Sequence, residues 1–403
     1  MFALLAVLGP GLVSAIAGDD AGGIATYASV GAKYGYQLLW TMVLITISLA
    51  VVQEMTARLS VATGKGLSDL IREQFGVKVT ALSMVALLLA NGAVTITEFS
   101  GIAAASELFG VSRYLTVPIA AVAVWWLVAR GSYRRSEQIF LVLALTLSVY
   151  VVSALVVQPD WLAVAQGTFI PTFRTDHDFI LLTIAVIGTT ISPYMQFTLS
   201  STIVDKGTRP EEYKAELFET LLGVLLSDGF SYFIIVATGA TLFVHGINNI
   251  DSADQAALAL VPIAGPLAER LFGVGLLGAS LLAASVLPLS TAYAICEAFG
   301  WERGVNQELD DAPVFYGIYT ALIAGGALVA LLPSAGFFLL SILAYDLNGI
   351  LLPVLLILIL RLANNRRLLG PRVNSPLVNF LGWATTILLI VLTVLLMISG
   401  IVQ

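Results

Sequence analysis

Two adjacent carboxylates interrupt the first apolar stretch of the chain. Asp19 and Asp20 lie within Gly18–Gly23, and apolar residues surround them from Phe2 to Val30. A hard cation is bound by one or two carboxylates together with main-chain oxygens and water. One of the two carboxylates can instead cap the helix that follows, by accepting a hydrogen bond from its exposed N–H groups. The pair therefore predicts a cation site, a helix cap, or one residue in each role.

A second group of oxygen-bearing side chains surrounds a proline near the middle of the chain. Gly188–Pro193 interrupts another apolar stretch and contributes Thr189, Thr190 and Ser192. This stretch contains neither Cys nor His, and Met195 follows three residues after Ser192. Because soft metals favour sulfur and imidazole, a site made only of oxygens predicts Mg²⁺, Ca²⁺ or Mn²⁺.

Two further carboxylates lie inside apolar stretches. Asp346 lies within Ala344–Gly349. Its side chain either faces the cation site or makes a structural hydrogen bond to a neighbouring helix. Glu98 follows Asn91 and Thr95 at the spacing of one helix face. This polar stripe either lines an aqueous path or provides hydrogen bonds between helices.

The composition indicates the environment in which these groups act. Hydrophobic residues make up 58% of the chain, charged residues make up 11%, and the mean hydropathy is +0.94. A soluble globular chain carries about 25% charged residues. The apolar runs are continuous rather than alternating, which favours membrane-spanning helices over a barrel. A carboxylate at the centre of a bilayer costs at least about 2.5 kcal/mol, so the carboxylates named above are candidates for function.

Few residues are available for other chemistries. The single Cys296 excludes a disulfide within the chain and a paired-cysteine metal site. His177 and His245 are the only histidines, so a membrane enzyme built on a histidine-rich metal centre is not expected. No basic patch is interleaved with aromatic residues, which argues against nucleic acid as a partner. We therefore expect no enzyme activity and no resident cofactor.

Segments of the length that crosses a bilayer, about 20 apolar residues, occur about eleven times along the chain. The predicted spans are Phe2–Val30, Tyr36–Ala57, Thr80–Phe109, Leu115–Arg130, Ile139–Val157, Phe179–Val204, Phe218–Val244, Leu271–Phe299, Val314–Leu332, Gly336–Leu360 and Val378–Ile401. We expect one transmembrane domain over residues 1–403, with five-helix repeats at 1–157 and 179–360 and an additional helix at 378–401. The interruptions fall in the first span of each repeat. Such a pair of broken spans predicts a transporter of inverted repeats whose substrate binds at the breaks.

The cationic residues predict the orientation of these spans. With the N-terminus in the cytoplasm, only Lys33, Arg113, Arg174 and Arg270 of the 19 Lys and Arg residues fall on the outer side. An excess of Lys and Arg marks cytoplasmic loops. We therefore expect a multi-pass protein of the cell (inner) membrane with a cytoplasmic N-terminus.

The first interrupted span resembles the first helix of the Nramp family of divalent-metal transporters. The similarity is carried by Gly9–Gly23, by Gly35–Trp40, and by Ala57–Leu59 with Thr63–Lys65, and it continues along essentially the whole chain. The resemblance implies the all-α, inverted-repeat fold of the amino-acid transporter LeuT, with helices 1 and 6 broken at mid-membrane. It also selects Asp20, rather than Asp19, as the metal ligand.

The chain departs from the family pattern at the implied metal site and along the family's proton route. Gly23 replaces the asparagine of the first helix, Ser192 replaces the methionine of the sixth, and Asp346 replaces the glutamine of the tenth. Along the proton route, Tyr194 and Leu199 replace two histidines, Thr95 and Glu98 replace an acidic pair, and the arginine pair of the ninth helix is missing.

These departures resemble the Nramp-related magnesium transporters. The resemblance implies a metal site formed by Asp20, Gly23, Thr189, Ser192 and Asp346, and transport of Mg²⁺, with Mn²⁺ also accepted, that is not coupled to protons. The first alternative is a proton-coupled importer of Mn²⁺ or Fe²⁺. The second is an amino-acid or sodium-coupled organic transporter, although Asp19 and Asp20 would repel a substrate carboxylate. We expect a monomer whose partners are the divalent ion and the lipid bilayer.

Overall fold

The computed structural model describes residues 20–129, 148–305, 307–332 and 336–402, and every regular element in these ranges is a helix. Within the first predicted repeat, the helices are α3 (Ala21–Tyr34), α4 (Leu39–Thr63), α5 (Leu67–Leu108), α6 (Arg113–Ala129) and α8 (Val149–Val156). The short helix α9 (Trp161–Phe169) separates them from the second repeat. Gly76, with a φ of 79°, bends α5 close to Thr80, where the third span was predicted to begin.

The second predicted repeat contains the sixth span as two separate helices. The long elements are α10 (His177–Thr190), α11 (Pro193–Asp205), α12 (Tyr213–Thr238) continued by η2 (Gly239–Phe243), α15 (Ala268–Phe299), α16 (Pro313–Ala330) and α17 (Phe337–Ala363). Four short elements precede α15, namely α13 (Ala253–Ala257), η3 (Leu258–Leu260), α14 (Val261–Ala264) and η4 (Gly265–Leu267). The chain ends with α18 (Arg366–Leu369), η5 (Gly370–Arg372) and α19 (Pro376–Val402).

The helices confirm the predicted all-α membrane architecture. Within the described ranges, 8 helical segments are long and apolar enough to cross a membrane, and α6 is a shorter apolar helix. The predicted break Gly188–Pro193 coincides with the gap between α10 and α11. Of the predicted first span, residues 2–19 lie outside the described residues, as do residues 139–147 of the fifth.

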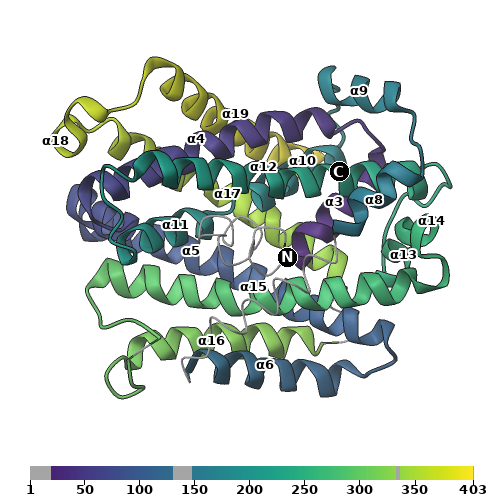
Figure 1. Ribbon diagram of the computed structural model, residues 1–403, viewed down its shortest axis with the longest axis horizontal. Coiled ribbons are helices and arrows are strands. Elements are labelled where there is room, and N and C mark those ends of the chain that lie inside the picture. Colours follow the sequence, from purple (N-terminus) through teal and green to yellow (C-terminus); the bar gives the residue numbers. More distant parts are fainter. Residues whose placement is uncertain (1–19, 130–147, 306, 333–335, 403) are drawn as a thin grey trace.

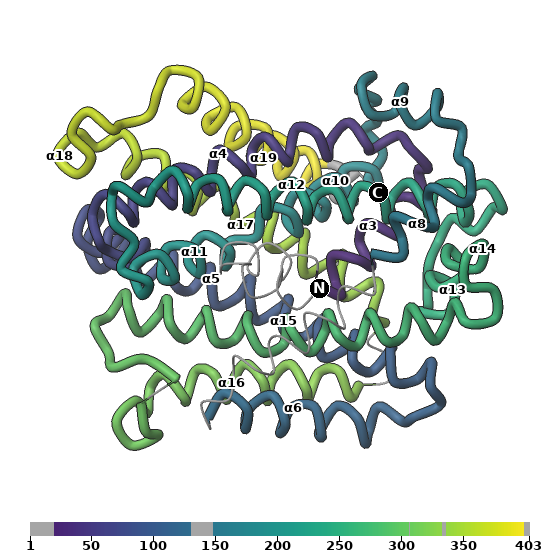
Figure 2. Tube along the Cα trace, viewed as in Figure 1, coloured from purple at the N-terminus to yellow at the C-terminus, as the bar shows by residue number. Residues whose placement is uncertain are grey.

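Helices α3 and α17 lie in the interior of the helix bundle. Figure 1 shows α6 and α16 side by side along one edge and α4 with α19 near the opposite edge, while α3 and α17 lie between these pairs. The trace in Figure 2 places α13 and α14 at one end of the molecule, where α14 packs beside α8. Large apolar side chains are exposed on the outer helices, as on a lipid-facing surface, and they include Ile119, Val122, Ile387 and Val391.

Two glycines allow α10 and α17 to pack backbone against backbone. A Cβ on Gly188 would lie 2.0 Å from the carbonyl oxygen of Tyr345. A Cβ on Gly349 would lie 2.9 Å from the carbonyl oxygen of Ile184. Small residues at such crossings let membrane helices approach closely. This contact brings the polar part of α17 next to the break between α10 and α11.

Candidate metal-binding site

At the first of the two breaks, the interruption that the sequence places at Gly18–Gly23, the start of α3 is capped by Asp20. This residue is the N-cap of α3, and its Oδ1 accepts a hydrogen bond from the backbone N–H of Gly23 over 2.8 Å. The hydroxyl of Tyr345 on α17 donates a second hydrogen bond to the same oxygen. The Asp20 side chain is buried, with 2% of its surface exposed. The capping role that the sequence left open thus belongs to Asp20, and Asp19 lies outside the described residues.

Glu98 completes the cap of α3 from another helix. Its Oε2 accepts from the N–H of Ala21 and its Oε1 from the N–H of Gly22, each over 3.3 Å. The first turn of a helix leaves its N–H groups without intrahelical partners, and a carboxylate there is favoured by the helix dipole. Elsewhere on the polar stripe of α5, the Asn91 amide donates to the Thr291 hydroxyl over 2.7 Å. The structure therefore supports hydrogen bonding between helices as the role of this stripe.

The second break is stabilised by Ser192 and Asn348. Ser192 is the N-cap of α11, and Pro193 begins this helix without an N–H to pair. The Ser192 hydroxyl lies 3.0 Å from the carbonyl oxygens of both Gly188 and Thr189, to which it donates. The Asn348 amide of α17 lies 3.4 Å from the Ser192 hydroxyl. The serine oxygen therefore keeps a lone pair for a further ligand.

The two breaks meet at Gly23. A Cβ on this residue would lie 2.8 Å from Thr189 Oγ1 and 3.0 Å from Asp20 Oδ1. One turn further along α3, the hydroxyls of Tyr27 and Thr190 are hydrogen-bonded over 2.8 Å. Thr189 Oγ1 is buried and has no hydrogen-bond partner in the described part of the chain. A buried hydroxyl without a partner, close to a carboxylate, is suited to a ligand that brings positive charge.

Asp346 occupies a different position from these residues. It is buried, with 5% of its surface exposed, and neither of its carboxylate oxygens has a hydrogen-bond partner among the described residues. It follows Tyr345, which contacts Asp20, by one position, or about 100° around the helix. Sequence reasoning missed Tyr345 and Asn348, although both lie in the polar interruption Ala344–Gly349 that it identified. Their spacing of three residues places them on one face of α17.

A further carboxylate escaped the sequence analysis. Asp228 lies in α12, within the predicted span Phe218–Val244, and 5% of its surface is exposed. Its Oδ2 has no hydrogen-bond partner among the residues that the structure describes. An isolated carboxylate inside an apolar run was the available signal, since the same signal identified Asp346.

The donor set at the breaks matches a hard cation. In the described ranges, no group of three or more His, Cys, Asp or Glu side chains could hold a metal by itself. The available ligands are the Asp20 carboxylate, the Thr189 and Ser192 hydroxyls, and backbone carbonyls at the breaks. Oxygen ligands of this kind suit hard divalent cations, which keep part of their water shell at such a site.

Charged residues tie α3 to α10 at the end away from the breaks. Lys33 pairs with Asp178 over 2.6 Å, and the Tyr34 hydroxyl donates to Asp176 over 2.8 Å. Burial opposes ionisation of Asp176, but hydrogen bonds from Tyr34, Arg174 and the Phe179 N–H keep its pKa below the usual value. Helices α3 and α10 are therefore connected both at the breaks and at their far ends.

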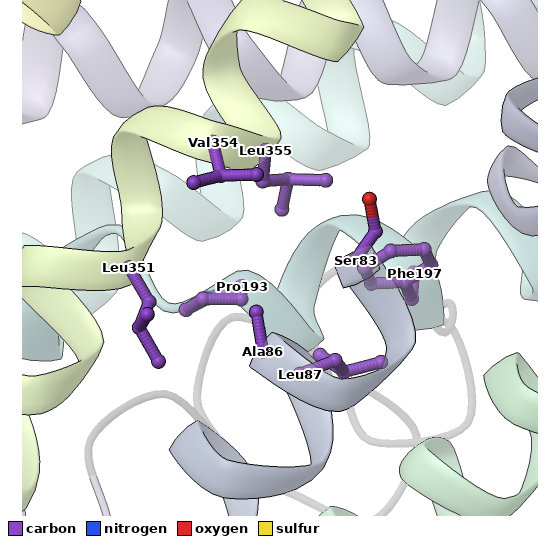
Figure 3. Close-up of a pocket in the computed structure, with 8 residues that line it drawn as sticks. All are labelled: Ser83, Ala86, Leu87, Pro193, Phe197, Leu351, Val354 and Leu355. Carbon is purple, nitrogen blue, oxygen red and sulfur yellow. The ribbon is translucent and has the colours of Figure 1, made fainter. Parts of the chain in front are cut away.

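An apolar cavity lies beside the second break. Its lining comes from α5, α11 and α17 and consists of Ser83, Ala86, Leu87, Pro193, Phe197, Leu351, Val354 and Leu355 (Figure 3). The Ser83 hydroxyl is the only polar side-chain group in this lining. The cavity therefore offers little to a cation, and the candidate site remains the polar region around Gly23.

The start of α3 lies against the gap between α10 and α11, inside a bundle of apolar spans, and this arrangement is typical of the class of membrane transporters with broken helices. The chain matches the family described as natural resistance-associated macrophage protein-like over residues 11–399, and so it belongs to the Nramp family. Members of this family are transporters rather than enzymes, and the chain is accordingly a multi-pass membrane transporter.

Individual relatives and solved structures agree with this assignment. The chain is 27% identical over 409 residues to the divalent metal cation transporter MntH of Bacillus subtilis (strain 168). This match covers 98% of this chain and 92% of the relative. A mutant of the Eremococcus coleocola manganese transporter superposes with a TM-score of 0.74 at 19% identity, over 98% of this chain and 86% of the other. The nucleobase-cation-symport-1 family transporter Mhp1 superposes with a TM-score of 0.55 at 15% identity, over 98% of this chain and 93% of the other. These likenesses confirm the predicted LeuT-type fold.

Proposed function

We propose that this protein carries divalent metal ions across the cell membrane by alternating access, with Mg²⁺ as its main substrate and Mn²⁺ as an accepted one. The observation that carries the proposal is the oxygen-only set at the meeting point of the two breaks. Asp20 provides the carboxylate, and Thr189 Oγ1 is a buried hydroxyl with no hydrogen-bond partner in the described ranges. The names of the relatives, which are divalent metal cation and manganese transporters, support the substrate class.

The proposed ligands are Asp20, Gly23 through its backbone, Thr189, Ser192 and Asp346, some of them acting through water. Mg²⁺ dehydrates reluctantly, so ligands that contact its water shell can be as useful as direct ones. Both Asp346 oxygens lack a partner among the described residues and are available to such a shell.

The preference for Mg²⁺ over Mn²⁺ rests on the absence of sulfur at the second break. Ser192, at the N-cap of α11, offers an oxygen where the resemblance places a methionine in the wider family. Met195 is buried in an apolar cluster that includes Leu282 and Ala344. Without a thioether ligand, the site gives softer ions no advantage over the far more abundant Mg²⁺.

We further propose that transport is uncoupled from protons, and that the protein acts as a monomer with a cytoplasmic N-terminus. His177 begins α10 and His245 follows η2, so both histidines lie at helix ends rather than at the breaks. Glu98 is engaged by backbone N–H groups, which favours a structural role over proton transfer. The membrane potential is then the driving force for a divalent cation.

One experiment tests substrate and coupling together. The protein is reconstituted into vesicles containing a pH-sensitive dye, and influx of Mg²⁺ and Mn²⁺ is followed under an applied membrane potential. We expect influx of both ions without acidification of the lumen, and no influx through the Asp20→Ala variant. Acidification in proportion to metal uptake would refute the uncoupled mechanism. Mn²⁺ influx without Mg²⁺ influx would refute the substrate preference.

Proton-coupled Mn²⁺ transport is the second candidate. It is favoured by the buried carboxylates Asp346 and Asp228, each with at least one oxygen that lacks a partner in the described part of the chain. A carboxylate in this situation can change its protonation state during a transport cycle. The same dye measurement, repeated with Asp228→Asn, distinguishes this candidate, because removing the proton-carrying group would abolish the acidification.

A further inference from the structure

We propose that the Tyr345 hydroxyl makes Asp20 a one-oxygen ligand and thereby disfavours Ca²⁺ relative to Mg²⁺ at this site. The inference rests on the proposed function, because it concerns how the same site distinguishes between divalent ions. Tyr345 is therefore a positioning residue, which acts on the ion through Asp20.

The hydrogen bonds around Asp20 are unevenly distributed between its two carboxylate oxygens. Oδ1 accepts from the Gly23 N–H over 2.8 Å and from the Tyr345 hydroxyl. Every hydrogen bond that the described residues donate to this carboxylate falls on Oδ1. Each carboxylate oxygen has about two lone-pair sites, so Oδ1 is filled by residues that the structure describes, and these residues leave Oδ2 for the ion.

The tyrosine ring is held so that its hydroxyl stays in this position. Tyr345 is fully buried, with 0% of its surface exposed. Its ring packs against the start of α3, since a Cβ on Gly22 would lie 2.8 Å from Cε2 and 3.2 Å from the hydroxyl oxygen of Tyr345. On the other side, a Cβ on Gly188 of α10 would lie 2.0 Å from the backbone carbonyl oxygen of Tyr345. The ring of Tyr345 is thus in close contact with α3 and its main chain with α10, and both contacts hold the hydroxyl next to Asp20.

The number of oxygens that a carboxylate presents matters differently to the two ions. Ca²⁺ takes six to eight oxygen ligands at about 2.3–2.6 Å and readily accepts both oxygens of one carboxylate. Mg²⁺ requires a near-octahedral shell at about 2.0–2.1 Å, in which a carboxylate contributes one oxygen and waters fill most other positions. With Oδ1 occupied, Asp20 can satisfy the requirement of Mg²⁺ but offers Ca²⁺ one ligand fewer.

A competing explanation is that Tyr345 merely covers Asp20 and has to leave before any ion binds. The two explanations differ in what happens when the hydroxyl is removed. If Tyr345 only blocks the carboxylate, Tyr345→Phe strengthens the binding of Mg²⁺ and Ca²⁺ by the same factor. If it positions the carboxylate, the variant strengthens the binding of Ca²⁺ relative to Mg²⁺.

The test is the binding of Mg²⁺ and of Ca²⁺, measured separately by calorimetry on the full-length protein in lipid nanodiscs. The wild type is compared with Tyr345→Phe, which keeps the ring and its packing. Tyr319→Phe is the matched control, because Tyr319 is also fully buried and donates its hydroxyl to the Val124 carbonyl in another part of the bundle. We expect the ratio of Ca²⁺ affinity to Mg²⁺ affinity to rise about tenfold in Tyr345→Phe, as is typical for losing a hydrogen bond to a charged group. Tyr319→Phe should leave this ratio unchanged.

A spectroscopic signature complements the affinities. The separation between the asymmetric and symmetric carboxylate stretches narrows when a carboxylate changes from one-oxygen to two-oxygen coordination, so infrared difference spectra with Ca²⁺ should show this narrowing in Tyr345→Phe but not in the wild type. An unchanged affinity ratio, an equal gain for both ions, or identical spectra would overturn the inference. A wild-type protein that binds neither ion would instead refute the proposed function, so the two failures are distinguishable.

Discussion

Truncating Glu98 tests how the first break is held together. In the wild type its carboxylate accepts hydrogen bonds from the N–H groups of Ala21 and Gly22, each over 3.3 Å, and its side chain is fully buried. Glu98→Ala leaves both N–H groups without this acceptor. Leaving a buried donor unpaired costs about 1–3 kcal/mol, so the two together cost about 2–6 kcal/mol. Removing the buried carboxylate also removes its own desolvation cost, so we expect a value near the lower limit.

This loss should weaken metal binding as well as stability. Asp20 is in place for an ion only when the first turn of α3 is formed, because the same residue caps that turn. About 2 kcal/mol corresponds to a Mg²⁺ affinity about 30-fold lower. Glu98→Gln keeps one acceptor oxygen and should therefore fall between the wild type and Glu98→Ala. Thermal unfolding in detergent and Mg²⁺ calorimetry measure the two effects.

A glutamate on the surface of the same helix provides the control. Glu107 pairs with Arg113 over 2.6 Å, and 43% of its side chain is exposed. Such a pair contributes at most about 1 kcal/mol, so Glu107→Gln should change neither unfolding nor binding appreciably. Wild-type Mg²⁺ affinity in Glu98→Ala would refute the argument that Glu98 holds the break. The same conclusion would follow if Glu98→Gln were the weaker of the two variants.

Three further predictions concern the second break, the contact between the breaks, and the topology. Ser192→Met should shift relative affinity from Mg²⁺ toward Cd²⁺ and Mn²⁺, since a thioether adds affinity only for softer ions; an unchanged ratio in competition binding would place this position away from the ion. Gly23→Ala should abolish Mg²⁺ binding in calorimetry, because the added Cβ would lie 2.8 Å from the Thr189 hydroxyl oxygen; wild-type affinity would contradict the close contact of the two breaks. In a cysteine-free background, Glu211→Cys and Thr175→Cys should react with an impermeant reagent from the cytoplasmic and outer sides, respectively, and labelling from the same side would rule out the predicted orientation.

The broken helices were predictable from the sequence because glycine and proline act locally. Pro193 lacks the N–H that would continue α10 into α11, and Asp20 is a residue type that caps a new helix. Continuous apolar runs likewise predicted the spans, because a membrane helix has to satisfy its backbone within one segment. These features require no knowledge of which helices are neighbours.

The partners of the break residues could not be predicted in the same way. The apolar surroundings of Asp346 in the sequence, and then the resemblance, directed attention to that residue, whereas the structure places the neighbouring Tyr345 against Asp20. One position corresponds to about 100° around a helix, so the choice depends on how α17 is rotated in the bundle, which is a property of packing. Glu98 posed the same difficulty, since its sequence spacing suited both an aqueous path and a contact with another helix. A tyrosine also gives a weak signal in an apolar run, because most of its side chain is itself apolar.

The pairing of the first break with distant parts of the chain has a consequence for biogenesis. The acceptor for Ala21 N–H is 77 residues further along the chain, and the tyrosine that donates to Asp20 is 325 residues further. In hydrocarbon, each unsatisfied polar group costs several kcal/mol. When α3 emerges from the ribosome, Glu98 and Tyr345 have not yet been synthesised, so the polar groups that these residues pair with at the start of α3 still lack them. The hydrogen bonds that Glu98 and Tyr345 make at the start of α3 can therefore all form only once α5 and then α17 have joined the bundle.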